Sequence, residues 1–151
     1  MRIIAGDLLE LAVAGAFDVI VHGCNCHCTM GAGIAKTIKT RFPEAYSADL
    51  ATSKGDRSKL GTISFAEIKR PHHSLVVVNA YTQYDWRGSG KKVDYDAIRT
   101  SMQSVKRIFG GKRIGYPLIG AGLAGGDWNE IAPIIDEALD GEDHTLVRYV
   151  P

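Results

Sequence analysis

The sequence predicts an α/β fold in which helices cover both faces of a mostly parallel β-sheet. Segments with strand patterns alternate with segments with helix patterns along the chain, and this order is typical of layered α/β sandwiches. The run from Leu75 to Ala80 is continuously apolar, as in strands that are covered on both faces. A length of 151 residues suits one domain, so we expect residues 1–151 to form a single domain with one site.

Local patterns define the expected elements. Strands are expected over residues 2–5, 17–22, 62–68, 75–80, 113–119 and 145–150, which are rich in apolar and β-branched residues. Helices are expected over residues 7–14, 34–41, 44–52, 94–109 and 128–139. Asp7 and Asp127 each open an Asp-x-x-Glu capping box at a helix start, and Gly110-Gly111 ends the longest helix. We expect an early hairpin-like pair of strands to be the antiparallel exception in the sheet.

The charge composition gives no overall attraction to nucleic acid or to an anionic membrane, because the formal net charge is only +1. Two local basic patches occur, one formed by Lys54, Arg57 and Lys59 and the other by Arg87, Lys91 and Lys92. Both lie in polar segments, so we interpret them as solvated loop charges. The chain shows no signal-peptide pattern and no apolar run of about 20 residues, so we expect a cytoplasmic protein without a membrane segment.

The cysteines Cys24, Cys26 and Cys28 are odd in number and lie in one short segment, which excludes an extended disulfide framework and fits a reducing compartment. Together with His22 and His27 they could be interpreted as the ligands of a zinc ion. Structural zinc sites usually use C-x₂₋₄-C pairs from two places, whereas C-x-C-x-C sends alternate side chains the same way without a second cluster. We therefore expect no metal, and interpret Cys24 and Cys26 as small buried hydrophobic residues.

Two glycine-rich loops are the most informative feature of the sequence. The first, Gly31-Ala32-Gly33-Ile34, opens an expected helix, where free N–H groups and the helix dipole favour an anion. The second, Gly120 to Gly125, matches G-x-G-x-x-G after an expected strand. A dinucleotide fold needs a longer βαβ unit than the one helix and one strand expected after Gly125. The loops instead suggest a clamp for a diphosphate, with tight strand-to-helix turns as the alternative.

Three stretches, Val21–Cys26, Met30–Ala35 and Gly120–Gly125, resemble the signature loops of the macro-domain family. The resemblance spans nearly the whole chain, from Gly6-Asp7 to Tyr149, in the family's order. It implies a three-layer α/β/α sandwich with a mixed, mostly parallel central sheet, and ADP-ribose as the ligand, without a cofactor. The His-x-Cys-Asn-Cys run from His22 to Cys26 is similar to the branch that processes ADP-ribose 1''-phosphate.

The resemblance also implies roles for individual residues. Asp7 would accept a hydrogen bond from the adenine amino group, with Leu8 beside it in the binding set, and Tyr149 would stack on the ring. Asn25 would bind the distal ribose. The ribose and the diphosphate would be lined by Gly31, Ala32, Gly33 and Ile34, and the phosphates covered by Gly120, Ala121, Gly122, Leu123, Ala124 and Gly125. A side chain at Gly122 or Gly125 would block the ligand or strain the backbone. As alternatives, Asp7 only caps a helix and Tyr149 belongs to the core.

Two residues are candidates for catalysis. His22 would act as general base or acid in water attack, unless it is a hydrogen-bonded structural histidine. Asp127 would orient a water, although it is also a helix cap. A related branch of ADP-ribosyl hydrolases uses a lysine in the loop after a central strand. Gln83 stands where that lysine is expected, and glutamine cannot act as a base or form an adduct.

These features support one leading hypothesis and two alternatives. The leading hypothesis is a hydrolase that binds ADP-ribose 1''-phosphate and removes its phosphate. The alternatives are a non-catalytic ADP-ribose reader and an ADP-ribosyl hydrolase that acts on an ADP-ribosylated macromolecule, either protein or nucleic acid.

Overall fold

The computed structural model describes residues 1–151 and contains one six-stranded sheet in the order β1-β6-β5-β2-β4-β3. Its strands are β1 (Arg2–Gly6), β2 (Val19–Cys24), β3 (Ile63–Lys69), β4 (Ser74–Tyr81), β5 (Ile114–Tyr116) and β6 (His144–Tyr149). All neighbouring strands pair in parallel except β3 and β4, which form an antiparallel hairpin. The expected mixed, mostly parallel sheet is confirmed.

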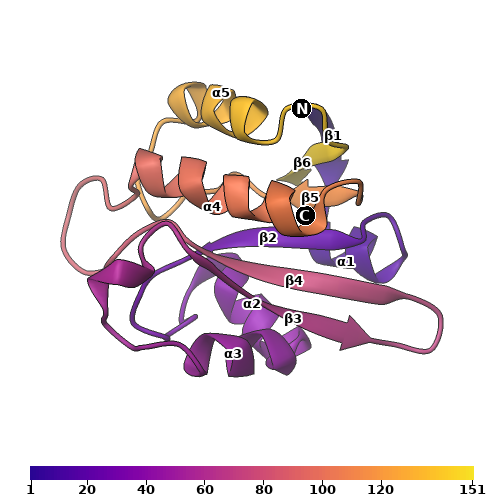
Figure 1. Cartoon of the computed structure of the whole chain (residues 1–151), viewed down its shortest axis with the longest axis horizontal. Helices are drawn as coiled ribbons and strands as arrows, with labels where there is room; N and C mark the ends of the chain where they lie inside the picture. The colour runs from indigo at the N-terminus through magenta and orange to yellow at the C-terminus, as the bar shows by residue number, and fades with distance from the viewer.

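Helices cover both faces of this sheet (Figure 1). They are α1 (Leu8–Val13), α2 (Gly33–Arg41), α3 (Pro43–Leu50), α4 (Tyr95–Phe109) and α5 (Trp128–Ala138), with a short 3₁₀ turn, η1, at Arg57–Lys59. The first three pack on one face in a buried cluster with residues such as Ile20 and Val77, and α4 and α5 pack on the other with Val21 and Val78. The three-layer α/β/α prediction is therefore confirmed.

The structure differs from the expected elements mainly at β5. The sequence predicts a strand over residues 113–119, but β5 ends at Tyr116. Pro117 follows it, and a proline has no N–H to continue the ladder. Residues 117–119 instead lead into the second glycine loop and line a cleft. No helix is both long and apolar enough to span a membrane.

Candidate functional site

A cleft of about 740 Å³ lies at the carboxyl ends of β2, β4, β5 and β6. This is the edge where parallel α/β sheets bind ligands. Its walls come from the first glycine loop, the segment after β4, the second glycine loop and the end of β6. The lining residues are Gly23, Cys24, Asn25, Thr29, Met30, Gly31, Ala32, Gly33, Ile34, Ala35, Asp49, Thr82, Gln83, Trp86, Gly88, Lys92, Pro117, Leu118, Ile119, Gly120, Gly122, Leu123, Ala124, Val147 and Tyr149.

Most of the ligand-binding residues that the sequence predicts meet in this cleft. Asn25, the whole of the first loop from Gly31 to Ile34, and Tyr149 belong to its lining. In the second loop every predicted residue except Ala121 and Gly125 does so. Asp7 and Leu8 do not line it, and Leu8, the first residue of α1, points into the buried core. Both glycine loops therefore line the same cleft.

The segment before the first glycine loop is held by its own side chains. The Asn25 side-chain oxygen accepts the His27 backbone N–H at 2.8 Å, and its amide nitrogen donates to the Thr29 hydroxyl at 2.8 Å. Cys28 and Met30 have φ angles of 56° and 41°, which are uncommon for residues with a side chain. Backbone strain of this kind persists where the surroundings enforce it, and here it shapes the wall of the cleft.

The N-terminus of α2 opens on the cleft without a capping side chain. Ala32 is the N-cap and makes no side-chain hydrogen bond to the helix. The helices α1, α4 and α5 are instead capped by aspartates. Because Gly33, Ile34 and Ala35 line the cleft, the free N–H groups of the first turn and the positive end of the helix dipole lie at its wall. Such a helix end stabilises a phosphate or another anion.

The second glycine loop needs glycine at two of its positions. Gly120 and Gly125 have φ angles of +76° and +75°, in the left-handed region. The predicted backbone strain is thereby confirmed for Gly125. Gly122 has no positive φ and has open space at its missing β-carbon, so for this residue only the predicted block on ligand approach remains. A methyl carbon of Leu123 lies 3.5 Å from the point that a β-carbon of Gly33 would occupy, so the two loops face each other closely.

The segment between β4 and α4 ties the two loops together. The Thr82 N–H donates to the Cys24 carbonyl at 3.2 Å, on the side of the first loop. The Lys92 N–H donates to the Ala124 carbonyl at 2.7 Å, on the side of the second. Gln83, which occupies the place of the lysine of a related branch, lines the cleft.

Tyr149 lines the cleft at the end of β6, and Asp7 directly follows Gly6, the ladder partner of Tyr149. Tyr149 pairs with Gly6 in the ladder between β1 and β6, and its side chain is 71% exposed. The core interpretation of Tyr149 is therefore wrong. One oxygen of Asp7, Oδ1, accepts the N–H groups of Leu9 and Glu10 at 3.0 and 3.2 Å. The predicted cap is confirmed, and the second carboxylate oxygen makes no such bond.

The structure separates His22 from the cleft. Its side chain is completely buried, and it is not among the lining residues. The ring Nε2 donates to the Asn79 side-chain oxygen at 2.6 Å, because that oxygen can only accept. Burial lowers the pKa of His22 to about 4, which keeps the ring neutral at ordinary pH. Direct contact with a ligand stays an untested prediction, and this burial and its hydrogen bond count against it.

His22 begins a chain of buried and partly buried hydrogen bonds that ends at Asp49, which lines the cleft. The Asn79 amide donates to the Ser64 hydroxyl at 3.0 Å, and that hydroxyl lies 2.8 Å from the Tyr81 hydroxyl. The Tyr81 hydroxyl donates to Asp49 Oδ1 at 2.7 Å. A polar chain of this kind fixes the rotamers of its members, so His22 holds cleft residues in place from behind.

Asp49 is a cleft residue that the sequence interpretation missed. Its side chain is 1% exposed, its Oδ2 has no hydrogen-bond partner, and the residue lines the cleft. Burial raises the pKa of its carboxyl group above the ordinary range. One signal was available in the sequence, since Asp49 follows Ala45 by four positions in an expected helix and therefore shares its buried face.

Asp127 lies outside the cleft, and of the three cysteines only Cys24 lines it. Asp127 is exposed, accepts the Asn129 N–H as the cap of α5 and does not line the cleft. The three thiols are buried and reach separate partners: Cys24 contacts His22, Cys26 donates to the Gln83 carbonyl, and Cys28 donates to the Asp49 carbonyl. Burial raises the pKa of the Cys24 thiol well above its usual value, so we do not assign it a nucleophilic role.

The burial of His22 predicts a loss of stability in acid. Its pKa is 6.5 in the unfolded chain and about 4 in the folded one, so only the unfolded chain binds a proton as the pH falls through this window. The free energy of unfolding is then highest above pH 6.5 and falls by about 3 kcal/mol by pH 4. Between pH 7 and pH 5 the loss is about 2 kcal/mol.

Urea unfolding of the His22→Gln variant at these two pH values checks this prediction. The pH dependence of that variant is expected to be shallower than that of the unsubstituted protein by the same amount. His72→Gln is the matched control, because His72 is exposed and its loss leaves the slope unchanged. Equal slopes for the two variants would show that His22 titrates normally in the folded protein.

Comparison with known proteins places these features in a family. The family model described as "Macro domain" matches residues 21–135. An uncharacterized 17.5 kDa protein of Enterobacteria phage T4 is 36% identical over 156 residues, which cover 100% of this chain and 97% of the phage protein. The ADP-ribose 1''-phosphate phosphatase of Candida albicans is 24% identical and is matched over 91% of this chain and 92% of its own length.

A longer relative and a solved structure are also similar to this chain. The DNA ADP-ribosyl glycohydrolase of Mycobacterium tuberculosis is 28% identical over 97% of this chain, which spans only 41% of that protein. The solved structure of the macrodomain of Mycobacterium tuberculosis DarG aligns with a TM-score of 0.75 at 23% identity, over 99% of this chain and 98% of the other. The architecture, the two loops and the family model agree, and the chain belongs to the Macro domain family.

Proposed function

We propose that this chain binds ADP-ribose and hydrolyses the bond between C1'' of the distal ribose and a leaving group, with ADP-ribose 1''-phosphate as its small-molecule substrate. The observation that carries the proposal is that Asp49 lines the cleft and has a buried carboxyl group whose Oδ2 lacks a hydrogen-bond partner. Two relatives support it, since one is named as an ADP-ribose 1''-phosphate phosphatase and the other as a DNA ADP-ribosyl glycohydrolase.

The cleft suits each part of ADP-ribose. The free N–H groups of α2 and the glycine backbone of the second loop receive the diphosphate, as helix ends and glycine-rich loops do for other phosphates. Tyr149 offers an exposed ring face to adenine at the outer end. The distal ribose then lies toward Asn25, whose amide nitrogen keeps a second N–H beyond the bond to Thr29.

Hydrolysis requires a group that accepts a proton from water. Four cleft residues carry ionisable side chains: Cys24, Asp49, Lys92 and Tyr149. The Cys24 thiol is held protonated by burial, and Tyr149 lies at the outer edge. Asp49 has a raised pKa, which brings a carboxyl group closer to the value suited to acid–base work near neutral pH. Asp49 takes a proton from water as the water oxygen bonds to C1'', and the leaving group departs with the electrons of the broken bond and takes a proton from solvent.

The proposal is tested by measuring two quantities on the purified chain. Calorimetry with ADP-ribose measures binding, and release of phosphate from ADP-ribose 1''-phosphate measures turnover. Binding with turnover supports the hydrolase. Binding without turnover of this substrate, or of an ADP-ribosylated oligonucleotide or protein, supports the reader, and absence of binding at millimolar ligand overturns the proposal.

Asp7 provides a separate test of the adenine end. The Asp7→Asn variant keeps a side-chain oxygen to cap α1, so its free energy of unfolding is expected to stay within about 0.5 kcal/mol. The second oxygen becomes a donor that opposes the adenine amino group. Loss of a charge-assisted hydrogen bond then weakens ADP-ribose binding by about 1.5–3 kcal/mol, measured by calorimetry. Unchanged ADP-ribose affinity would show that Asp7 only caps α1 and does not bind adenine.

A further inference from the structure

The cleft contains a single cationic side chain, that of Lys92, which is half-buried in its wall. No other lysine and no arginine belongs to the cleft lining. The Lys92 ammonium donates to the Gly90 carbonyl at 2.9 Å and takes part in no ion pair. An ammonium group has three N–H donors, so two of them remain for an anionic ligand.

Backbone and side-chain contacts hold Lys92 beside the part of the cleft that follows β4. The Lys92 N–H donates to the Ala124 carbonyl at 2.7 Å, and the residue after Lys92 bridges to Gln83. Gln83 lines the cleft close to the end of β4. Its carbonyl accepts the thiol of Cys26, the residue that follows Asn25. Lys92 and Asn25 therefore belong to the same end of the cleft.

The order of the strands separates this end from the adenine end. Tyr149 ends β6, and β5 and β2 lie between β6 and β4 in the sheet. The separation is three strand spacings, about 14 Å. The helix α2, whose first turn lines the cleft, packs against β2. With adenine at Tyr149 and the diphosphate at α2, as in the proposed function, C1'' of the distal ribose lies toward Lys92.

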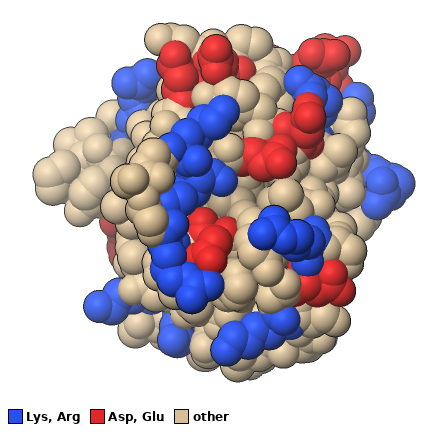
Figure 2. Space-filling model, turned by 90° about the vertical axis from the view of Figure 1, so that its left-hand side faces the viewer, with Lys and Arg blue, Asp and Glu red and all other residues tan.

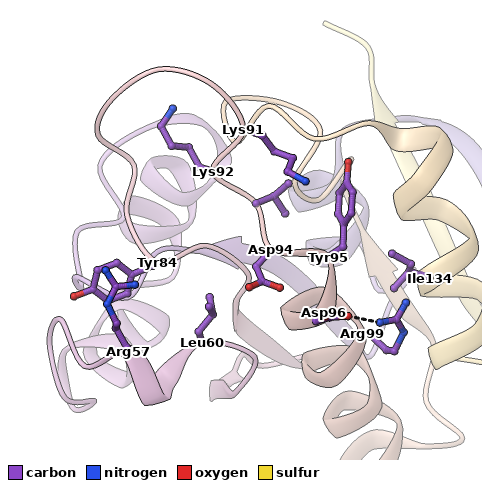
Figure 3. A pocket seen from close by; sticks show the side chains of 11 residues that line it. Arg57, Leu60, Tyr84, Lys91, Lys92, Asp94, Tyr95, Asp96, Arg99 and Ile134 are labelled. Carbon is purple, nitrogen blue, oxygen red and sulfur yellow. Dashed lines mark hydrogen bonds and ion pairs between the residues drawn. The ribbon is translucent and has the colours of Figure 1, made fainter.

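The neighbouring lysine has different surroundings. Figure 2 shows adjoining Lys and Arg side chains in a band across the side of the molecule where the β4–α4 segment lies. Within this segment, Lys91 turns to the ring of Tyr95, 4.2 Å from its centre, whereas Lys92 points away from that ring (Figure 3). Lys91 is exposed and does not line the cleft. Of the two adjacent cations, only Lys92 is therefore placed to contact a ligand in the cleft.

We propose that Lys92 recognises the phosphate on C1'' of ADP-ribose 1''-phosphate, so that this end of the cleft selects an anionic substituent. This role of Lys92 rests on the proposed function. A hydrogen bond between two charged groups is stronger than one between neutral groups. ADP-ribose carries a hydroxyl group at C1'' and lacks this phosphate, so Lys92 distinguishes the substrate from the product and favours release of the product.

The same contact assists the reaction. As the water oxygen bonds to C1'' and Asp49 takes one water proton, the bond between C1'' and the phosphate oxygen breaks. The phosphate leaves with both electrons of that bond and takes a proton from solvent, while the other water proton stays on the new C1'' hydroxyl group. Negative charge on the phosphate grows in the transition state, where the Lys92 ammonium stabilises it more than in the substrate. Lys92 keeps its own protons throughout.

The test compares Lys92→Gln with Lys91→Gln, which removes the same charge from the adjacent position. In Lys92→Gln, kcat/KM for ADP-ribose 1''-phosphate is expected to fall at least about tenfold, as for a lost hydrogen bond to a charged group. In Lys91→Gln it stays within about twofold. Calorimetry with ADP-ribose gives an affinity within about threefold in both variants, because the phosphate at C1'' is missing. Lys92→Arg keeps the cation, so its kcat/KM stays within about threefold of the unsubstituted protein.

Four results would overturn the proposal. Equal weakening of ADP-ribose and ADP-ribose 1''-phosphate in Lys92→Gln would place Lys92 at the diphosphate instead. Equal losses in Lys92→Gln and Lys91→Gln would reveal a general effect of charge. A loss in Lys92→Arg as large as that in Lys92→Gln would show that the positive charge is not what matters. Unchanged kcat/KM in Lys92→Gln would leave Lys92 without a part in recognition.

Binding measurements separate this role from the proposed hydrolysis. If the unsubstituted protein binds ADP-ribose 1''-phosphate without turning it over, the hydrolase fails and calorimetry tests Lys92 alone. The unsubstituted protein is then expected to bind ADP-ribose 1''-phosphate at least about tenfold more tightly than ADP-ribose. Lys92→Gln is expected to bind the two within about threefold of each other. Absence of any preference in the unsubstituted protein would overturn the role of Lys92, and absence of binding to either ligand would overturn both proposals.

Discussion

Replacing Asp49 by asparagine is expected to lower the rate of ADP-ribose 1''-phosphate hydrolysis at least about a hundredfold, the usual contribution of a positioned general base. Asparagine keeps an oxygen that accepts the Tyr81 hydroxyl, which now lies 2.7 Å from Asp49 Oδ1. Burial already disfavours the charged carboxylate, so a neutral amide of the same shape costs little stability. Calorimetry with ADP-ribose is therefore expected to give an affinity within about threefold of that of the unsubstituted protein.

The pH profile distinguishes proton transfer by Asp49 from a purely structural role. If its carboxylate is the base, the rate rises with pH through a pKa above that of an ordinary aspartate, and this limb disappears in Asp49→Asn. Glu44→Gln is the control, because Glu44 lies on the same helix, is paired with Arg70 and does not line the cleft. If the Asp49→Asn variant keeps its hydrolysis rate within about threefold and its pH profile is unchanged, Asp49 takes no part in the mechanism.

Gly120→Ala is expected to destabilise the protein by about 4 kcal/mol and to weaken ADP-ribose binding at least about tenfold. The φ angle of Gly120 is +76°, and a β-carbon there would lie 2.7 Å from a methyl carbon of Val93 and within 3.3 Å of Ile98 and Ile131. These neighbours belong to the buried core between the sheet and α4 and α5. The second loop must therefore shift away from the cleft, and urea unfolding with calorimetry measures both effects.

Gly122→Ala is the matched control in the same loop. A β-carbon at this position meets no atom within 4 Å, and the φ angle is not positive, so the free energy of unfolding stays within about 0.5 kcal/mol. Its effect on affinity then reports how closely a ligand approaches the loop, without a contribution from folding. Similar losses of stability for Gly120→Ala and Gly122→Ala would contradict the packing described for Gly120.

The fold could be predicted because its determinants are local. Apolar runs, the aspartate caps of α1 and α5 and the glycines after β5 each indicate an element or its end within a few residues. The boundary of β5 was the main error, since an apolar pattern continues past Pro117 while the hydrogen-bonded ladder cannot.

The candidate site was predictable only in part. Glycines with positive φ and a helix opening on a loop leave a pattern in the sequence, so both walls of the cleft were found. His22 was assigned toward the cleft because it ends a strand. Both faces of β2 are buried, however, so the apolar pattern does not tell which layer a given side chain faces. The structure turns His22 toward Asn79, on the side of α3.

Lys59 illustrates the same limit in a charged segment. The sequence suggests a solvated patch with Lys54 and Arg57, but the Lys59 ammonium is buried and donates to the Cys26 carbonyl at 3.1 Å. The solvated-loop interpretation is wrong for this residue. A lysine can extend its apolar stem inward when a backbone oxygen receives its charged end, and that oxygen comes from a segment more than thirty positions away.

The sequence by itself determined the α/β alternation, the two glycine loops and the caps, because periodicity, turns and backbone angles depend on near neighbours in the chain. Tertiary structure alone decided that Asp49 joins the cleft and that His22 stays behind it. The physical reason is that these contacts join distant segments. They depend on how sheet and helices pack, which no short stretch of sequence encodes.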